Sequence, residues 1–171
     1  MAKLHKKVPE KDRDAAAEAP RARPLWSRPG YLVRRLHQIH QALFLEECKA
    51  FRITPVQYGL LTALSVRPGL DQVSLAAELG IDRTNVADVL ARLAARGLVR
   101  RAPGERDRRV RRAYLSEEGV RLTARMQGAM QRAQERLVAP LAPAEREQLM
   151  VLLTRLIEAN NQYGRALFRP S

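Results

Sequence analysis

The sequence has few of the residues that build catalytic, metal-binding or cross-linked sites. Cysteine occurs once, as Cys48, which excludes an intramolecular disulfide. Three histidines and one thiol cannot assemble the usual kind of zinc cluster. A glycine-rich phosphate loop and a G-x-S-x-G nucleophile elbow are both missing. We therefore expect no enzyme, no metal and no cofactor.

Long hydrophobic runs are also missing. No stretch approaches the roughly 20 apolar residues that a membrane helix needs. The N-terminal residues MAKLHKKVPEKDRD lack the apolar centre of a signal sequence. A reducing compartment fits the single cysteine, so we expect a cytoplasmic protein with no membrane partner.

The chain has an excess of positive charge. Its 31 lysines and arginines outnumber 18 aspartates and glutamates, and the net charge is +13. Such an excess attracts polyanions, although arginine-rich composition can also reflect a GC-rich genome. The location of the charge is more informative than its sum. Between Arg96 and Arg112, eight arginines face one glutamate and one aspartate, a local net charge of +6.

Two short helical patterns meet at a glycine in the middle of the chain. The first runs from Ser74 to about Leu79, and Gly80 follows it as a left-handed C-cap. Asp82 can cap the second, which Gly97 ends. Two helices joined through the residues LGID, the second with a polar outer face, form the pattern of a helix-turn-helix.

The polar face of this second helix provides the candidate contacts with DNA bases. Threonine, asparagine and arginine match the donor and acceptor pattern of base edges. An aspartate is repelled by phosphates, so the alternative role for Asp88 is to orient Arg92, four residues further on. A second alternative is an ordinary solvated helix face. The predicted DNA-contacting residues of this helix are Thr84, Asn85, Asp88, Arg92 and Arg96.

A basic hairpin follows. Residues 98–101 and 110–115 read as strands, and residues 103–107 read as the turn between them. Because strand side chains alternate, Arg109 and Arg111 share one face, and Arg108 and Arg112 share the other. The eight arginines therefore cannot all touch DNA.

The apolar pattern divides the chain into four segments. Residues 1–24 lack periodicity and predict a flexible basic arm that either contacts the DNA backbone weakly or has no role. Residues 25–53 predict a helix that begins near Pro29 and runs to about Phe51. Residues 54–115 form the DNA-binding domain, and residues 116–168 predict two more helices.

These features together resemble the MarR family of transcriptional regulators. The resemblance rests on the core LAxxLGIDRTNVADVLARLAARGLV, on Asp107-Arg108-Arg109, and on the residues YLSEEG that follow, and covers roughly residues 30–165. It implies a mainly α protein with a small β wing, a winged helix-turn-helix with long N- and C-terminal dimerisation helices. It also implies an obligate homodimer with a ligand pocket between the dimerisation and DNA-binding parts.

The same resemblance implies roles for the hairpin, which is the wing. Asp107 would pair with Arg109 or a neighbour and shape the loop, and a tip arginine, Arg106 or Arg109, would enter the minor groove. Arg108, Arg111 and Arg112 would contact phosphates or support the fold. The predicted DNA contacts of the wing are Arg106, Arg108 and Arg109. Two recognition helices in one dimer predict a pseudo-palindromic operator with half-sites about one helical turn apart.

The segment WSRPGYLVRRLHQIH, residues 26–40, resembles the subgroup that responds to aromatic or heteroaromatic acids or their thioesters. Arginine can grip a carboxylate with two hydrogen bonds, tryptophan offers an aromatic wall, and histidines three residues apart share a helix face. The candidate ligand residues are Trp26, Arg28, Arg34, His37 and His40. Alternatively, Trp26 fastens the arm to the domain and the histidines lie at a dimer interface.

We therefore expect a sequence-specific transcriptional regulator, a repressor released by a small aromatic or heteroaromatic acid or its thioester. One alternative is a constitutive or architectural DNA-binding protein without an effector. An enzyme using His37 and His40 with Glu46 and Glu47 as acid–base groups is a further alternative, which no nucleophile or cofactor motif supports.

Overall fold

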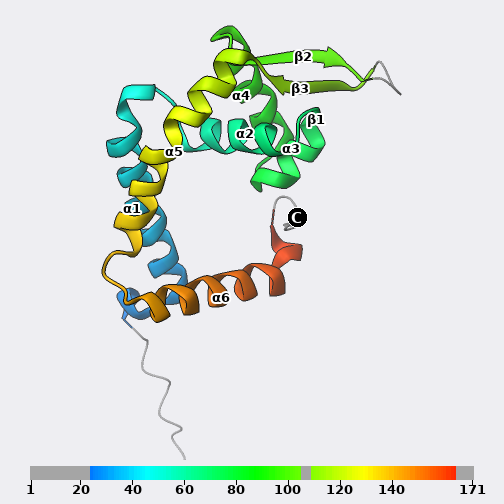
Figure 1. Ribbon diagram of the computed structural model, residues 1–171. Helices are drawn as coiled ribbons and strands as arrows, with labels where there is room; N and C mark the ends of the chain where they lie inside the picture. The colour runs from blue at the N-terminus through cyan, green and yellow to red at the C-terminus, as the bar shows by residue number, and fades with distance from the viewer. Residues whose placement is uncertain (1–23, 105–108, 165–171) are drawn as a thin grey trace, which may run out of the picture. The chain divides into compact units, whose positions relative to one another are not determined.

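The computed structural model describes residues 24–104 and 109–164 (Figure 1). The predicted arm, residues 1–24, lies outside the described residues apart from Pro24. The chain divides into two compact units, Met1–Leu36 and His37–Ser171. The first contains a 3-10 turn, η1 (Leu25–Ser27), and the beginning of helix α1 (Pro29–Cys48).

In the second unit, α1 ends at Cys48 and a 3-10 turn, η2 (Lys49–Phe51), replaces the predicted last turn of the helix. Helix α2 (Pro55–Val66) then begins with a capping box. The Thr54 hydroxyl accepts a hydrogen bond from the Gln57 N–H (3.3 Å), and Gln57 Oε1 accepts one from the Thr54 N–H (3.0 Å). These bonds satisfy two backbone donors that a helix start otherwise leaves unpaired.

The predicted helix-turn-helix is present as α3 (Gln72–Leu79) and α4 (Arg83–Ala95). Asp71 caps α3, and Gly80 ends it with φ 63°, a left-handed conformation that glycine adopts without a steric penalty. Asp82 occupies the N-cap position of α4, but its side chain forms no cap hydrogen bond, so that part of the prediction was wrong.

The wing is part of a three-stranded antiparallel sheet with the order β1-β3-β2. Strands β2 (Val99–Pro103) and β3 (Arg111–Leu115) form the predicted hairpin, whose turn falls largely on residues 105–108, outside the described part. Strand β1 (Leu70–Asp71) was not expected; it pairs with β3 through Ala113 and Arg112. In Figure 1 the hairpin extends away from α3 and α4.

Two further helices complete the second unit. The hydroxyl of Ser116 accepts a hydrogen bond from the Gly119 N–H (3.0 Å) and caps α5 (Glu117–Val138). The next helix, α6 (Pro143–Ala159), precedes a 3-10 turn, η3 (Asn161–Tyr163), and α6 has no buried residue. None of the helices in the described part of the chain combines the length and apolar character that crossing a bilayer requires.

A single hydrophobic core holds the second unit together. It joins the end of α1, helices α2 to α5 and the base of the wing. The apolar stripe of α4 is buried within it, and this burial turns the polar face of the helix outward. The stripe consists of Val86, Val89, Leu90 and Leu93. The fully buried side chains with the largest volumes include Phe44, Leu60, Leu61, Leu64, Leu75, Leu90, Leu93 and Met126.

Candidate nucleic-acid interface

The outward face of α4 carries the side chains predicted to reach DNA. Its opposite face is fixed by Val86, Leu90 and Leu93, each at most 1% exposed. This burial sets the rotation of the helix about its axis, since apolar residues at helical spacing can face the core only one way. The exposed residues of this face are Thr84, Asn85, Asp88, Arg92 and Arg96.

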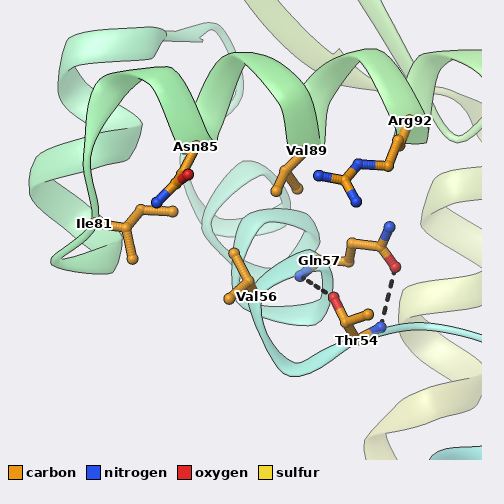
Figure 2. A pocket seen from close by; sticks show the side chains of 7 residues that line it. All are labelled: Thr54, Val56, Gln57, Ile81, Asn85, Val89 and Arg92. Carbon is orange, nitrogen blue, oxygen red and sulfur yellow. Dashed lines mark hydrogen bonds between the residues drawn. The ribbon is translucent and has the colours of Figure 1, made fainter.

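A hollow of about 240 Å³ separates α4 from the start of α2. Figure 2 shows Asn85, Val89 and Arg92 projecting from α4 towards Val56 and Gln57 of α2. The hollow has two of the predicted base-reading side chains, Asn85 and Arg92, in its lining beside the recognition helix.

Arg92 is oriented by the helix backbone rather than by the carboxylate of Asp88. Its Nε–H donates to the carbonyl oxygen of Asp88 at 3.3 Å. The Asp88 side chain remains exposed. The expected partnership between these two residues therefore exists, but it runs through the Asp88 main chain.

Arg96 has partners within the fold. It donates from Nη1 to the carbonyl of Arg52 (2.6 Å) and from Nη2 to the carbonyl of Phe51 (3.2 Å). Arg52 has φ 52°, the left-handed conformation that turns the chain between η2 and α2. Arg96 thus fastens the end of α4 to the turn before α2. Sequence reasoning missed this role because the partners are 44 and 45 residues away.

The wing arginines divide between the fold and the surface. Arg112 donates to the Gly69 carbonyl (2.8 Å) and supports the fold, one of its two predicted roles. The guanidinium of Arg100 lies 4.4 Å above the Tyr114 ring. Arg109 and Arg111 line one hollow between the wing and the starts of α3 and α4. The predicted residues Arg106 and Arg108, and Asp107 with them, lie outside the described part.

The candidate ligand residues fall in both units. In the second, His37 and His40 share a face of α1, with ring centroids 6.5 Å apart, and Gln41 Nε2 is 2.9 Å from His37 Nε2. In the first, Trp26 is 71% exposed, and Arg28 and Arg34 are exposed as well. Within residues 24–104 and 109–164, no group of three or more His, Cys, Asp or Glu side chains could hold a metal ion.

The two carboxylates considered for acid–base chemistry are engaged in ion pairs between α1 and α5. Glu47 accepts from Arg136 Nη1 (2.8 Å) and Arg132 Nε (2.9 Å), and Glu46 lies 3.1 Å from Arg136. Hydrogen bonds from Arg136 and Arg132 hold the pKa of Glu47 below its usual range. Both carboxylates therefore link two helices, and the lowered pKa of Glu47 makes this residue a poor proton donor or acceptor near neutral pH.

The chain is similar to known regulators over most of its length. Residues 53–110 match the family model described as MarR family. The PcaV transcriptional regulator of Streptomyces coelicolor, solved with its natural ligand, is 34% identical; the match covers 80% of this chain and 96% of that chain, with a TM-score of 0.72.

The chain is also similar to a regulator that responds to a small acid and to a repressor solved with DNA. The DNA binding of BpsR from Bordetella bronchiseptica is regulated by 6-hydroxynicotinic acid, and BpsR is 28% identical to this chain. The match covers 76% of this chain and 93% of the BpsR chain, with a TM-score of 0.74. The transcriptional repressor CouR, bound to a 23-mer DNA duplex, is 30% identical to this chain. The match covers 77% of this chain and 94% of the CouR chain, with a TM-score of 0.73. With its winged helix-turn-helix and this similarity, the chain belongs to the MarR family of DNA-binding transcriptional regulators and is not an enzyme.

Proposed function

We propose that this protein is a homodimeric repressor that binds a pseudo-palindromic operator and is released by a small aromatic or heteroaromatic acid or its thioester. The observation that carries the proposal is the exposed polar face of α4, held outward by a buried apolar stripe and lying beside a basic wing. A helix of this kind can enter the major groove while a hairpin contacts the flanking backbone.

In the proposed complex, Thr84, Asn85 and Arg92 contact base edges, and Asp88 orients Arg92, whose Nε–H donates to the Asp88 carbonyl. Asparagine pairs with adenine and arginine with guanine through two hydrogen bonds each, which gives sequence preference. The wing contributes Arg106, Arg108 and Arg109. The CouR structure, in which a protein of the same fold is bound to a DNA duplex, supports this arrangement.

A second copy of the chain is the proposed partner of the exposed apolar side chains on α1 and α6. Large hydrophobic side chains exposed together on one element indicate a surface that is covered in the working protein. On α6, Leu156 is 58% and Ile157 47% exposed; on α1, Ile39 is 47% and Leu45 55% exposed. These values describe a single chain, and dimerisation would bury them.

The proposed effector is an acid with an aromatic ring. Arg28 and Arg34 offer guanidinium groups for its carboxylate, Trp26 offers a ring face, and His37 and His40 offer polar imidazole edges. The 6-hydroxynicotinic acid that regulates BpsR supports this class of effector, and the PcaV structure with its natural ligand supports a response to a ligand. Binding would release DNA by stabilising a dimer in which the recognition helices are wrongly spaced.

Selection of bound DNA from a random pool tests the proposal directly. We expect a pseudo-palindromic sequence, and we expect benzoate, nicotinate or cinnamate compounds, free or as thioesters, to weaken binding at least about tenfold for one class. The His40→Ala variant should bind the same DNA but lose the response. Binding without sequence preference and with a steep salt slope would favour the architectural alternative. A selected sequence with no response to any compound would leave a constitutive regulator.

A further inference from the structure

Gly69, in the loop between α2 and α3, contacts three consecutive residues of the wing strand β3. Its N–H donates to the carbonyl of Ala113 (2.9 Å), and its own carbonyl accepts a hydrogen bond from Nη1 of Arg112 (2.8 Å). The ring of Tyr114 covers the place where a side chain would be, since a Cβ on Gly69 would lie 3.1 Å from its Cε1 and hydroxyl atoms. Gly69 has φ 81°, a left-handed conformation that favours glycine, so this loop is shaped to receive the ring.

The strand register places Tyr114 at the centre of a row that crosses the sheet. Leu70 lies opposite Ala113, and the antiparallel pairing therefore brings the preceding Gly69 beside Tyr114. On its other side, Tyr114 lies opposite Arg100 of β2. Residues opposite each other project from the same face of a sheet, which explains why the Arg100 guanidinium lies 4.4 Å from the centre of the ring. The ring therefore lies against Gly69 and beneath a cation of β2, an arrangement that favours one ring position.

This row lies where the wing joins the rest of the DNA-binding domain. Strand β1 has two residues, so its ladder with β3 is short, and the contacts around Gly69 extend the attachment. The hairpin continues outward from Tyr114 to the pair formed by Pro103 and Arg111, about 10 Å further along the strands. A small rotation at Tyr114 therefore moves the outer part of the wing by a larger distance.

The loop that receives the ring leads directly to the recognition helix. Asp71, the second residue of β1, caps α3 by accepting a hydrogen bond from the Ser74 N–H (2.8 Å). Gly80 ends α3, and α4 begins soon afterwards at Arg83. Gly69 is thus continuous with the helix-turn-helix, whereas Tyr114 belongs to the wing, and their contact links the two elements.

We propose that Tyr114 is a positioning residue that sets the direction of the wing relative to the recognition helix. The proposal rests on the proposed function, in which α4 enters the major groove and the wing reaches the minor groove. Both elements can engage one half-site only if the angle between them fits the DNA, and binding groups need to be held within about 10–20° of the productive geometry. Arg100 supports the ring in this arrangement and does not contact DNA.

Two substitutions of Tyr114 provide a matched test in the full-length protein. Tyr114→Phe keeps the ring, and Tyr114→Val removes it but retains a residue that favours strands. Each protein should be titrated with the selected operator and with a duplex in which only the base pairs flanking the major-groove half-sites are replaced by G·C pairs. The ratio of the two affinities measures recognition by the wing, because narrow A·T-rich minor grooves attract arginine.

We expect the wild type and Tyr114→Phe to prefer the selected operator about tenfold, the effect of one specific groove contact, and Tyr114→Val to bind both duplexes almost equally. Partial unfolding would weaken binding to both duplexes by the same factor, so the ratio separates positioning from stability. An unchanged ratio for Tyr114→Val overturns the proposal, as does loss of the preference in Tyr114→Phe, and the proposed function then stands. A wild-type ratio near 1 overturns both this proposal and the proposed contact of the wing.

Arg100→Gln tests the other partner of the ring. If the guanidinium supports Tyr114, the preference for the selected operator should fall, by less than in Tyr114→Val, and the slope of log K against log salt should stay unchanged. A slope reduced by about 1 together with an unchanged preference overturns the supporting role, because Arg100 would then neutralise a phosphate.

Discussion

Arg96, at the end of α4, and Arg52, in the turn before α2, are joined by a hydrogen bond of 2.6 Å from a guanidinium to a backbone carbonyl. A second bond, to Phe51, uses the other arm of the same guanidinium. Arg125 lies over the Phe51 ring, with 6.0 Å between its guanidinium carbon and the ring centroid. The recognition helix is thus tied to the turn that links α1 with α2.

Arg96→Lys separates this role from the DNA contact that the sequence suggests. Lysine keeps the charge but cannot reach two carbonyls with a planar fork. If Arg96 acts by holding the fold, Arg96→Lys should resemble Arg96→Ala and lose about 1.5–3 kcal/mol of stability, the range for hydrogen bonds that involve a charged group. Urea unfolding measures this loss, and the salt slope of DNA binding should stay unchanged.

A phosphate contact by Arg96 predicts a different pattern of stability and DNA affinity. If Arg96 neutralises a phosphate, Arg96→Lys should retain both stability and DNA affinity. In that case only Arg96→Ala should lower the salt slope, by about 1.

Local signals predicted the helix-turn-helix well. Gly80 has the left-handed conformation that its position suggested, and the stripe containing Val86 and Leu90 is buried as its spacing required. A local feature also begins α5, which Ser116 caps through its own hydroxyl. Each of these features depends on residues within one or two helical turns, so the sequence alone contains the necessary information.

Features that depend on distant residues could not be predicted in the same way. Strand β1 has two residues and exists because Leu70 pairs with Ala113. The hollow between the wing and the starts of α3 and α4 needs Arg83 and Arg101 in one lining, and the register that aligns the strands arises only on folding. The sequence showed that arginines were abundant here, but not which of them meet.

Gly119 and Gly128 of α5 should respond in opposite ways to alanine. A Cβ on Gly119 would lie 2.1 Å from the carbonyl oxygen of Leu98, a rigid backbone atom. A Cβ on Gly128 would meet nothing closer than 3.6 Å, where it would touch the end of the Arg132 side chain. We expect Gly119→Ala to cost about 3 kcal/mol through overpacking. Gly128→Ala should add up to about 1 kcal/mol, since alanine favours helix.

Urea unfolding of both variants measures these changes. The same sign of change in the two variants would show that α5 does not approach the start of β2 as closely as the structure indicates. Because both substitutions add one methyl group to the same helix, general effects of the added surface cancel in the comparison.

The dimer proposal predicts a monomer when a charge enters the apolar face of α6. Leu156→Glu should dissociate the dimer, because an unpaired carboxylate in an apolar interface costs more than an exposed leucine gains by burial. Arg155→Glu introduces the same residue at the adjacent exposed position, off the apolar stripe, and should leave the dimer intact. Sedimentation equilibrium distinguishes the two outcomes. A Leu156→Glu variant that remains dimeric would place the interface elsewhere.

Asp71 should make the stability of α3 depend on pH in the acid range. A hydrogen bond from the Ser74 backbone N–H holds the pKa of its carboxyl below the usual range. A group whose pKa is lowered by folding stabilises the folded state fully above its unfolded pKa, about 3.9 for aspartate. That contribution is lost as the pH falls through the lower pKa of the folded state.

The comparison of Asp71→Ala with Asp71→Asn isolates this effect. Removal of the cap should cost about 1 kcal/mol near neutral pH, and the cost of Asp71→Ala should shrink below about pH 4 as the wild-type carboxyl is protonated. Asparagine accepts the same hydrogen bond without titrating, so it retains the cap at every pH. Urea unfolding at pH 7, 5 and about 3.5 measures the three proteins. A cost of Asp71→Ala that stays constant to the lowest pH would show that the neutral carboxyl caps α3 as well as the carboxylate does.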